Sequence, residues 1–582
     1  MQRARNDAAD ARGLPGDPDG STPVERRFAG SRRSAAWAFA SYCLVSFAYF
    51  GVPVVAHPGR TAVGSDNDPK LFIWMFAWWP HAIAHGLNPI YTQTIWAPSG
   101  IDLAWITSVP ALALVFAPVT ALAGPVVAYN LAAIVLPALA AWTAFLLCRH
   151  LTRSWWSSLF GGYLFGFTSY VLGHEQGHLH LVAMFPVPLV VLVVLRGLRG
   201  ELGQRGLAWR LGVLLGVQCL LSTEVLATLA IASVLGVVLA LALVPAVRRP
   251  LASLAVPVTA GCAIGAVIAG PIVYYLLTDF VSDQFTTPAI FVADAVNLVV
   301  PTRTAALGGD SSAAISAHWL GDGLEQTAYF GGPLILLLVA LGIERVRDRA
   351  IRFLIAFLAA ALILAFGGGL HVDGHSVAVM PWSYLERLPV FDNVFPERFT
   401  LYVTLAAAVG VAVWCATSRL PRWFRVALPY LVLASLVPNL GKHHWDEKLV
   451  IPPLFSSSLY ERCFAPNENV LVLPYGYTGS SLLWQALSGF RFRMPGGEVG
   501  PEPPHSFRVG IVDSLRFDGI PAGQGADVVT FAHDKNVSTI VVDPNDPVNW
   551  ASLLTSVGPP RHAGGLLLYR IGDIDPAAYK GC

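Results

Sequence analysis

The sequence predicts a polytopic α-helical membrane protein that carries a small α/β domain at its C-terminal end. Of the 582 residues, 54% are hydrophobic and 13% are charged, whereas a soluble globular chain carries about 25% charged residues. Long apolar runs replace the missing charge, which indicates that lipid is the solvent for much of the chain. Arginine-rich clusters occupy every second connection between these runs, as in helical membrane proteins.

Residues 1–34 are rich in Arg, Asp, Gly and Pro and contain no apolar run, so we expect a disordered cytoplasmic tail. The apolar stretch after it is too long for a cleaved signal peptide, and we interpret it as a retained first span. About eleven apolar segments follow the pattern of transmembrane helices. They are 35–56, 126–148, 155–172, 180–196, 208–223, 225–247, 251–278, 328–343, 351–367, 399–417 and 424–440.

Six basic clusters set the predicted topology. They are Arg26, Arg27, Arg32 and Arg33; Arg149, His150 and Arg153; Arg196, Arg199, Arg205 and Arg210; Arg248 and Arg249; Arg345, Arg347, Arg349 and Arg352; and Arg419, Arg422 and Arg425. The positive-inside rule makes these clusters cytoplasmic. We therefore expect residues 35–440 to form a transmembrane domain in the cytoplasmic (inner) membrane, with a cytoplasmic N-terminus and a large first outer loop at 57–125.

The first outer loop contains two further apolar segments. Counting 103–123 as a span would invert every later cluster, so we interpret 70–86 and 105–122 as juxtamembrane helices in the outer interface. The first of them is rich in Trp, which prefers the level of the lipid headgroups. A hairpin of two true spans is the alternative interpretation.

Residues 441–582 change in character. Short β-rich runs appear at 469–475, 538–543 and 565–571, separated by Pro, Gly and polar loops. These features predict an extracytoplasmic α/β domain, which is long enough for its own core. Cys463 and Cys582 both fall in it, and they can pair if the domain faces an oxidising compartment. The net charge of +1 gives no reason to expect a nucleic-acid partner.

The ionisable groups of interest all fall on the predicted outer side, where charges near a membrane tend to mark function. Asp66 and Asp68 lie between the first span and the Trp-rich helix. Two carboxylates with this spacing can share a cation or divide the roles of base and ligand. A solvated turn is the structural alternative.

A second group is His174, Glu175 and His178. The two histidines are four residues apart and share one face if the segment is helical. They can ligate a divalent metal together with Asp66 and Asp68, or they can bind phosphate. A hydrogen-bonded polar turn between two spans is the alternative.

Two arginines lie on the outer side, where they cannot serve as positive-inside signals. Arg398 follows Glu397 at the entrance to the tenth span, and Arg303 lies in an outer connection. A guanidinium can grip a phosphate with a planar fork of donors, whereas a structural salt bridge is the other possibility. Glu224 either caps the helix that begins beside it or belongs to the same site.

The layout resembles the GT-C superfamily of polyprenyl-phosphate-sugar-dependent glycosyltransferases. The resemblance rests on Asp66-Asn67-Asp68 in the first outer loop, on Asn88-Pro89, on Ile95-Trp96-Ala97-Pro98-Ser99-Gly100 and on Phe165-Gly166-Phe167-Thr168-Ser169-Tyr170. The Leu473-Pro474-Tyr475 segment is similar to one in a bacterial subgroup of that superfamily.

The resemblance implies an inverting transfer of a sugar from a polyprenyl-phosphate donor to an envelope glycan, lipid or protein acceptor on the outer side. Asp66 or Asp68 would act as the general base, and Arg398, Arg303, a histidine or a divalent metal ion would stabilise the leaving phosphate. A transporter or flippase of lipid-linked sugars and a non-catalytic envelope assembly protein are the rival functions. Transporters usually place polar groups at the membrane midplane, whereas these spans are nearly free of charge.

Overall fold

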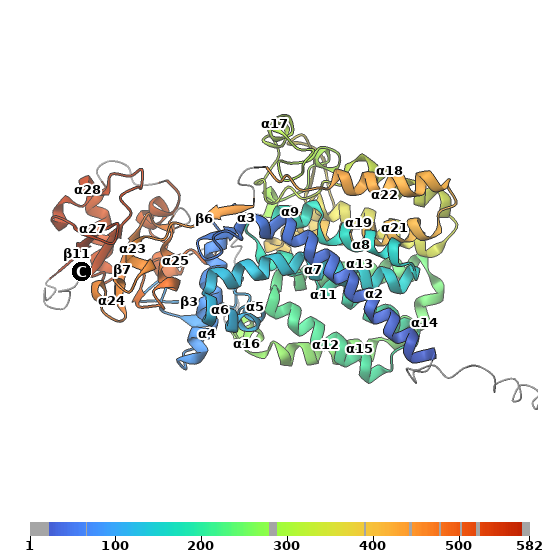
Figure 1. The fold of residues 1–582 in the computed structure, drawn as a ribbon, viewed down its shortest axis with the longest axis horizontal. Helices are drawn as coiled ribbons and strands as arrows, with labels where there is room; N and C mark the ends of the chain where they lie inside the picture. Colours follow the sequence, from blue (N-terminus) through green and yellow to red (C-terminus); the bar gives the residue numbers. More distant parts are fainter. Residues whose placement is uncertain are drawn as a thin grey trace, which may run out of the picture.

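The computed structural model describes residues 23–65, 67–278, 288–388, 391–441, 445–476, 479–500, 503–518, 524–572 and 582. Figure 1 shows an elongated molecule with the long apolar helices at one end and the C-terminal sheet with its helices at the other. Asp66 and residues 1–22 of the predicted tail lie outside the described residues.

Five helical segments in the described ranges are long and apolar enough to cross a membrane. They are Arg33–Val54, Pro125–Thr152, Leu179–Leu198, Thr223–Leu243 and Pro396–Thr417; a bent pair, Pro245–Ser253 with Ala255–Ile268, makes a sixth if it counts as one span. Shorter or less apolar helices occupy the other predicted segments: α8 (Trp155–Gly166), α12 (Gln204–Leu221), α18 (Gly331–Arg345), α19 (Arg349–Ala365) and α22 (Arg422–Ser435). The chain is thus a helical membrane protein, while the number of eleven spans stays a prediction.

The first helix begins earlier than predicted. Helix α2 (Pro23–Ser46) includes residues 23–34 of the expected tail and continues through η1 (Phe47–Gly51) and α3 (Val52–Val54). It packs along α7 (Pro125–Thr152), which also contacts α8 and α21 (Thr400–Thr417). Tyr42 of α2 is buried and donates a hydrogen bond to the Leu159 carbonyl at 2.8 Å, so its hydroxyl is satisfied inside the bundle.

Helices α12 and α15 (Ala255–Ile268) form a close pair built on glycine. A Cβ on Gly212 would lie 2.6 Å from the Ile264 side chain, and one on Gly216 would lie 2.8 Å from Ile268. Gly261 and Gly265 stand at the matching positions of α15. Small residues every four positions let two membrane helices approach closely, and α13 (Thr223–Leu243) follows directly after this pair.

Shorter elements lie between the long helices. They include β1 (Thr61–Val63), α4 (Pro69–Ala84), β2 (Tyr91–Thr92), β3 (Ile101–Asp102), α5 (Pro110–Val115), α6 (Ala117–Ala123), α9 (Ser169–His174), α16 (Gly270–Thr278), α17 (Asp310–Ser316), β4 (Gly369–Val372), β5 (His375–Val379) and α20 (Trp382–Leu385). The candidate span Leu179–Leu198 consists of α10 (Leu179–Val182) and α11 (Pro186–Leu198), and the span Pro396–Thr417 begins with η6 (Pro396–Phe399).

The Trp-rich helix α4 packs against other parts of the protein. Trp74 and Trp78 are almost fully buried. Trp74 Nε1 donates to Gln485 Oε1 at 2.7 Å, and Trp78 Nε1 donates to the Pro89 carbonyl at 3.0 Å. Both indole N–H groups are therefore satisfied by protein acceptors, one of them from α25 of the C-terminal region, which α4 contacts.

The C-terminal region contains a five-stranded sheet in the order β10-β11-β9-β7-β8. The strands are β7 (Glu468–Leu473), β8 (Phe492–Arg493), β9 (Thr539–Val542), β10 (Arg561–Ala563) and β11 (Leu566–Arg570), and the helices include α23 (Pro453–Ser456), α24 (Tyr460–Cys463), α25 (Ser481–Leu487), α26 (Gly510–Asp513), α27 (Gly525–Asp534) and α28 (Trp550–Leu553). Strand β7 runs parallel to β8 and β9, whereas β11 is antiparallel to its neighbours. The β-rich runs recognised in the sequence hold β7, β9 and β11.

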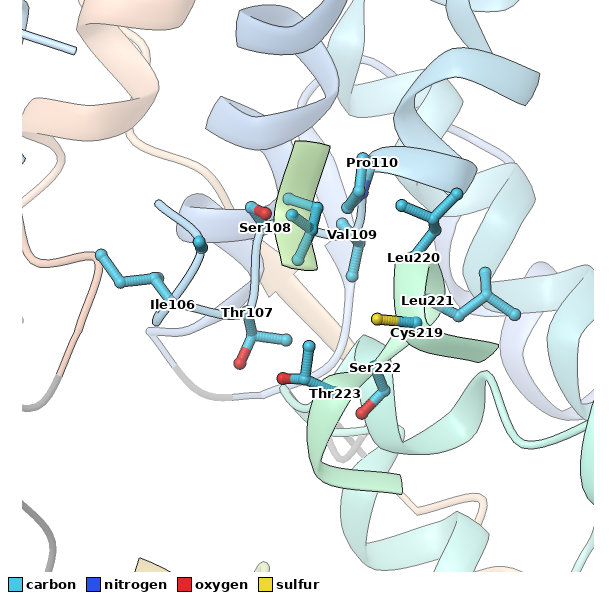
Figure 2. Close-up of a pocket in the computed structure, with 12 residues that line it drawn as sticks. Ile106, Thr107, Ser108, Val109, Pro110, Cys219, Leu220, Leu221, Ser222 and Thr223 are labelled. Atoms are coloured by element: carbon cyan, nitrogen blue, oxygen red, sulfur yellow. The ribbon is translucent and has the colours of Figure 1, made fainter. Parts of the chain in front are cut away.

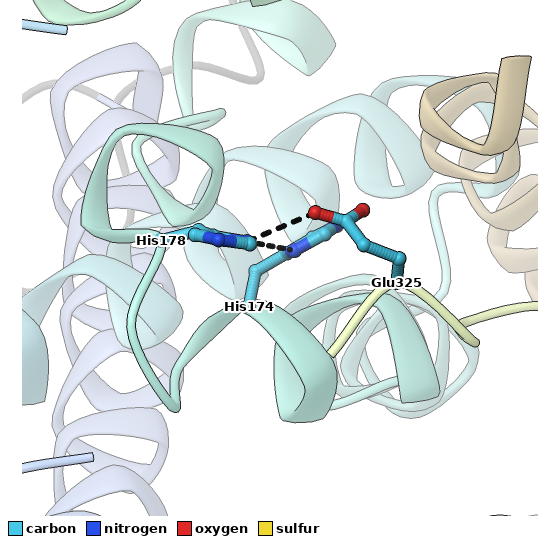
Figure 3. A group of neighbouring side chains, drawn as sticks. All are labelled: His174, His178 and Glu325. Carbon is cyan, nitrogen blue, oxygen red and sulfur yellow. Dashed lines mark hydrogen bonds and ion pairs between the residues drawn. The ribbon is translucent and has the colours of Figure 1, made fainter. Parts of the chain in front are cut away.

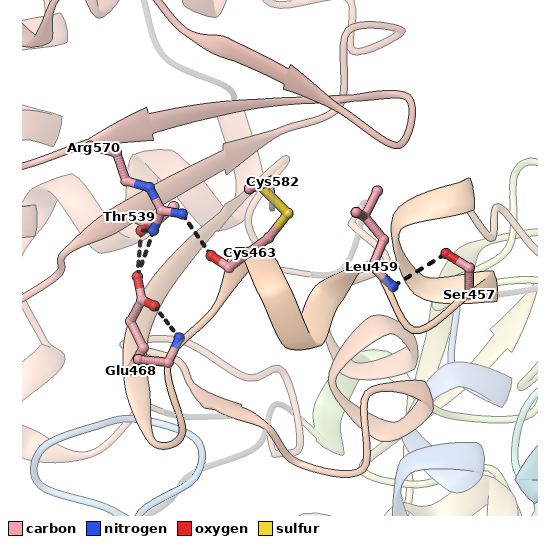
Figure 4. Close-up of a disulfide and its surroundings, with 8 residues drawn as sticks. Ser457, Leu459, Cys463, Glu468, Thr539, Arg570 and Cys582 are labelled. Atoms are coloured by element: carbon pink, nitrogen blue, oxygen red, sulfur yellow. Dashed lines mark hydrogen bonds and ion pairs between the residues drawn. A yellow bond between two sulfur atoms is a disulfide. The ribbon is translucent and has the colours of Figure 1, made fainter. Parts of the chain in front are cut away.

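A disulfide joins Cys463 to Cys582, with 4.8 Å between the Cα atoms (Figure 4). Next to it, Arg570 donates to the Cys463 carbonyl at 2.6 Å and to Glu468 Oε1 at 3.0 Å. The disulfide joins Cys582 to the end of α24, and Arg570 of β11 joins the same end of α24 to Glu468 of β7. The C-terminal region also joins the first outer loop, because β1 pairs with β6 (Asp446–Lys448).

Candidate functional site

The candidate site lies where the connection between α9 and α10 meets the start of the first outer loop. Ser65 donates through its backbone N–H to the Gln176 carbonyl at 3.0 Å and through Oγ to Gln176 Oε1 at 2.9 Å. Gly64 has φ +117°, and a Cβ there would lie 2.4 Å from the Gln176 carbonyl oxygen. Glycine is therefore required at this contact, which brings Asp68 next to His178.

Five ionisable side chains form a row from the first outer loop to α13. Asp68 Oδ2 lies 3.2 Å from His178 Nε2, and His178 Nδ1 lies 3.3 Å from Glu325 Oε1. Glu325 also pairs with Arg398 Nη1. On the far side, Arg398 Nε donates to Glu224 Oε1 at 2.8 Å. The signs of charge alternate along this charged row when His178 is protonated.

The two ends of the charged row are open and its centre is closed. The Glu325 and Arg398 side chains are each 4% exposed, whereas Asp68 is 29% exposed and Glu224 is 28% exposed. Charges in the buried centre interact more strongly than charges in water. A ligand can therefore reach the row at Asp68 or at Glu224 without unfolding its centre.

His174 flanks the charged row. The backbone N–H of His178 donates to the His174 carbonyl at 2.7 Å, so the two side chains lie on one face, as their spacing predicts. Their Nδ1 atoms are 3.2 Å apart (Figure 3). Arg398 Nη1 lies 3.2 Å from His174 Nε2, which ties this ring to the centre of the row.

The environment gives the two histidines different charges. Burial by itself lowers the pKa of His178, but the Glu325 and Asp68 carboxylates outweigh it and raise this pKa to about 9. His178 is therefore positively charged at neutral pH. Burial, followed by the effect of Arg398, holds the pKa of His174 well below its usual range, so His174 is neutral. Burial raises the pKa of Glu325, while its two cationic neighbours favour the ionised form.

Three residues proposed from the sequence lie apart from the charged row. Glu175 is buried, burial raises its pKa well above the usual range, and in the described part of the chain its carboxyl oxygens have no hydrogen-bond partner. Glu397 accepts hydrogen bonds from Thr327 N at 2.9 Å and Thr327 Oγ1 at 2.7 Å. Arg303 is exposed, and its backbone carbonyl accepts a hydrogen bond from Asn439 at 3.1 Å.

Sequence reasoning missed Glu325. Asp322 Oδ1 accepts hydrogen bonds from the backbone N–H groups of Leu324, at 2.9 Å, and Glu325, at 3.1 Å. This turn presents the Glu325 carboxylate to His178 and Arg398. No apolar run or motif surrounds Glu325 in the sequence, so there was no local signal for it.

His174, His178 and Glu325 fit a divalent metal ion. Among the described residues, their ligand atoms all lie within 4.8 Å of one another. The separations of 3.2 Å and 3.3 Å from His178 Nδ1 match the roughly 3.3 Å between neighbouring ligands of a tetrahedral zinc ion. Asp68 faces the other nitrogen of His178, where a carboxylate typically orients a metal-binding imidazole. Among the described residues, the third member of this group is Glu325; Asp66 lies outside the described residues, so the metal role predicted for the two aspartates stays a prediction.

A small space opens near the Glu224 end of the charged row (Figure 2). Its lining comes from residues 106–110, from the end of α12, from the start of α13 and from Ile272 of α16. Most of these side chains are apolar, but Ser222 and Thr223 bring hydroxyl groups directly before Glu224. The space is only large enough for about one water molecule.

The comparisons with known proteins agree with this architecture. The family model described as Domain of unknown function (DUF6311) matches residues 39–437, which is more than half of the chain. The chain belongs to this family. No curated protein matches the sequence of this family member.

Solved structures show which fold this family member has. The archaeal oligosaccharyltransferase AglB from Archaeoglobus fulgidus, in complex with an inhibitory peptide and a dolichol-phosphate, is similar with a TM-score of 0.51 and 13% identity, over 88% of this chain and 69% of that chain. The Archaeoglobus fulgidus oligosaccharyltransferase in complex with Zn and sulfate gives a TM-score of 0.51 and 14% identity over 87% and 68%. ArnT from Cupriavidus metallidurans bound to undecaprenyl phosphate gives 0.47 and 13% over 91% and 97%. The two oligosaccharyltransferase structures, both with a TM-score of 0.51, confirm the predicted resemblance to the GT-C superfamily at the level of the fold.

Proposed function

We propose that this protein is a GT-C glycosyltransferase that moves a sugar from a polyprenyl-phosphate donor to an acceptor on the outer side of the membrane. The observation that carries the proposal is the charged row, in which the open Asp68 carboxylate is connected through His178 and Glu325 to a buried arginine. One open end can activate an acceptor, and the cations behind it can stabilise a phosphate.

Each member of the charged row has a role in the proposed transfer. Asp68 accepts the proton of the acceptor hydroxyl as the general base, and His178 holds the carboxylate in place. The acceptor oxygen then forms a bond to the anomeric carbon as the bond to the phosphate oxygen breaks, with inversion at that carbon. Arg398 and His178 provide positive charge for the leaving phosphate. Asp66 stays the alternative base.

A divalent metal ion, if held by His174, His178 and Glu325, would supply positive charge near the leaving phosphate in place of the proton on His178, because a metal-bound imidazole is neutral. In this proposal the Asp68 end of the charged row faces the acceptor.

We propose the topology that the basic clusters indicate, with residues 1–34 in the cytoplasm and about eleven spans between residues 35 and 440. Residues 441–582 would form a separate domain outside the cytoplasmic membrane. The disulfide between Cys463 and Cys582 supports this orientation, because disulfides persist in oxidising compartments.

The test is transfer of labelled sugar from a polyprenyl-phosphate donor to envelope material, in membranes that contain the protein at equal levels. We expect Asp68→Asn and Arg398→Ala to lose transfer, while Arg387→Ala keeps it. Arg387 is the matched control because it is an exposed arginine of a neighbouring outer connection. A parallel Asp66→Asn variant distinguishes the two candidate bases, and a chelator tests the need for metal.

Three outcomes would redirect the proposal. Unchanged transfer in the Asp68, Asp66 and Arg398 variants would remove the charged row from the chemistry. Movement of lipid-linked sugar across the bilayer without transfer would favour a flippase, and preserved envelope assembly with inactive variants would favour a non-catalytic assembly protein.

A further inference from the structure

Two residues of the C-terminal region contact the helix that begins at Asp68. Helix α4 starts directly after Asp68, and it packs against α25 of the C-terminal region. We infer that Gln485 and Phe490 are positioning residues, which place the Asp68 carboxylate by holding α4. The inference rests on the proposed function, since it takes Asp68 as the general base.

The side chain of Gln485 is fully buried and uses both ends of its amide at the junction with the first outer loop. Its Oε1 accepts a hydrogen bond from Trp74 Nε1 at 2.7 Å. Its Nε2 donates to the carbonyls of Thr94, at 2.8 Å, and Phe492, at 2.9 Å. Three hydrogen bonds fix the orientation of the planar amide. Without this amide, the buried indole N–H of Trp74 loses its acceptor, which is unfavourable.

The ring of Phe490 packs against the aromatic face of α4. Its centroid lies 5.5 Å from that of Trp74, 5.2 Å from that of Trp78 and 4.6 Å from that of His81. These three residues share one face of the helix because of their spacing. The backbone N–H of Phe490 donates to the Gln485 carbonyl at 3.1 Å. The amide and the ring therefore meet α4 from one short segment.

The backbone of Phe490 is strained in order to make this contact. Its φ is +61°, and Gly489 before it has the same value. Glycine adopts this left-handed conformation freely, whereas a bulky residue rarely does. A strained residue of this kind persists where the surrounding packing over-determines its conformation. The aromatic contacts with α4 provide that packing for Phe490.

Helix α4 connects these contacts with Asp68. Trp74 is six residues after Asp68, which is about 9 Å along a helix axis. The Asp68 carbonyl accepts hydrogen bonds from Leu71 N, at 3.0 Å, and Phe72 N, at 3.3 Å, so residue 68 moves with the first turn. Its Oδ2 must also stay 3.2 Å from His178 Nε2. A shift of about 1 Å in a catalytic group can slow a reaction about 100-fold.

The first measurement is hydrogen–deuterium exchange on the full chain in nanodiscs. We expect Gln485→Leu to speed the exchange of the amides at 71–76 by about tenfold, because the hold on α4 is weakened. Trp484→Phe is the matched control from the same helix. The indole N–H of Trp484 donates within the C-terminal region, to the Val450 carbonyl at 2.8 Å, so its loss should leave exchange in α4 unchanged.

The second measurement is the kinetics of sugar transfer by the same preparations. We expect Gln485→Leu to lower kcat about 10–100-fold and to leave the KM for the polyprenyl-phosphate donor unchanged, because a misplaced base slows only the chemical step. Trp484→Phe should keep both constants. Combining Trp74→Phe with Gln485→Leu should lower kcat no further than the more severe single change, since both break the same contact.

The inference requires both effects of Gln485→Leu. Unchanged exchange in α4, or a wild-type kcat, overturns it. A fall in kcat that Trp484→Phe reproduces also overturns it, because lower stability of the C-terminal region then explains the loss. If Gln485→Leu does not fold, Trp74→Phe takes its place with the same expectations, since it removes the donor of the same hydrogen bond.

The two measurements separate this inference from the proposed function. Faster exchange in α4, with no sugar transfer by the wild-type protein, contradicts the proposed function and keeps the hold on the helix of Asp68. Transfer that Asp68→Asn abolishes and Gln485→Leu leaves unchanged keeps the proposed function and overturns the positioning.

Discussion

Replacing Arg398 by lysine tests the centre of the charged row. Arg398 binds Glu224 through Nε, and it contacts both Glu325 and His174 through Nη1. A lysine ammonium is a single compact charge that does not reproduce the planar fork of a guanidinium. In the Arg398→Lys protein, at least one of the two carboxylates therefore loses its charged hydrogen bond from residue 398.

The expected magnitudes follow from the geometry. A hydrogen bond to a charged group contributes about 1.5–3 kcal/mol, so the loss of one such bond should lower the free energy of unfolding by about 2 kcal/mol. Arg398→Ala removes one partner of a buried pair and should cost about 3–5 kcal/mol. If the guanidinium also stabilises the leaving phosphate, the loss of one donor costs about 2.7–4 kcal/mol in the transition state, which is about 10²–10³-fold in kcat.

The assay combines thermal unfolding, followed by tryptophan fluorescence, with sugar transfer by the same preparations. Arg387→Ala is the control, because its guanidinium is exposed and stacks on the Tyr384 ring, with 5.9 Å to the centroid. A lysine variant that unfolds at the wild-type temperature and transfers sugar at the wild-type rate would refute the reasoning.

Three further predictions concern stability. Because the pKa of folded His178 is about 9 against an ordinary 6.5, its contribution is complete below pH 6.5 and is lost as the pH rises through 9. In metal-free buffer, the thermal unfolding midpoint of the wild type should fall between pH 6.5 and pH 9, whereas that of His178→Gln should not. If the two proteins show the same dependence of the midpoint on pH, the ion pairs of His178 do not contribute to stability. Gly212→Leu should lower the free energy of unfolding by more than the roughly 1–3 kcal/mol typical of overpacking, since a Cβ there already lies 2.6 Å from the Ile264 side chain. An unchanged unfolding midpoint would contradict the close helix pair. Cys463→Ser removes the disulfide to Cys582 and should lower the free energy of unfolding by about 2–4 kcal/mol, which would appear as faster proteolysis of the C-terminal region. Cys262→Ser, at an exposed free thiol, is the control. Equal rates of cleavage in the two variants would contradict the prediction.

The apolar helices were predictable because lipid imposes a simple rule on sequence. Each segment must be apolar over its length, so the predicted run at 126–148 falls inside α7 and the run at 399–417 coincides closely with α21. The contacts of α4 could not be predicted from its Trp content, because an indole N–H can donate equally well to a lipid headgroup or to a side chain such as Gln485. Only the packing of the C-terminal region against α4 decides between them.

Part of the candidate site was also visible in the sequence. Asp68, His178 and Arg398 stand out because each is an ionisable residue next to an apolar segment, where charge is costly. The same rule selected Glu175 and Glu397, which the structure directs elsewhere. Sequence position tells that such a residue is unusual, but it does not tell which way its side chain points.

The sequence alone determined the solvent of the chain, its helical class and the neighbourhood in which ionisable residues gather, since these depend on composition and on short-range periodicity. Only the tertiary structure decided that Glu325 completes the charged row and that Cys463 meets Cys582. Both contacts join residues far apart in the chain. Their formation depends on the burial of everything between them, and no local pattern in a sequence encodes that.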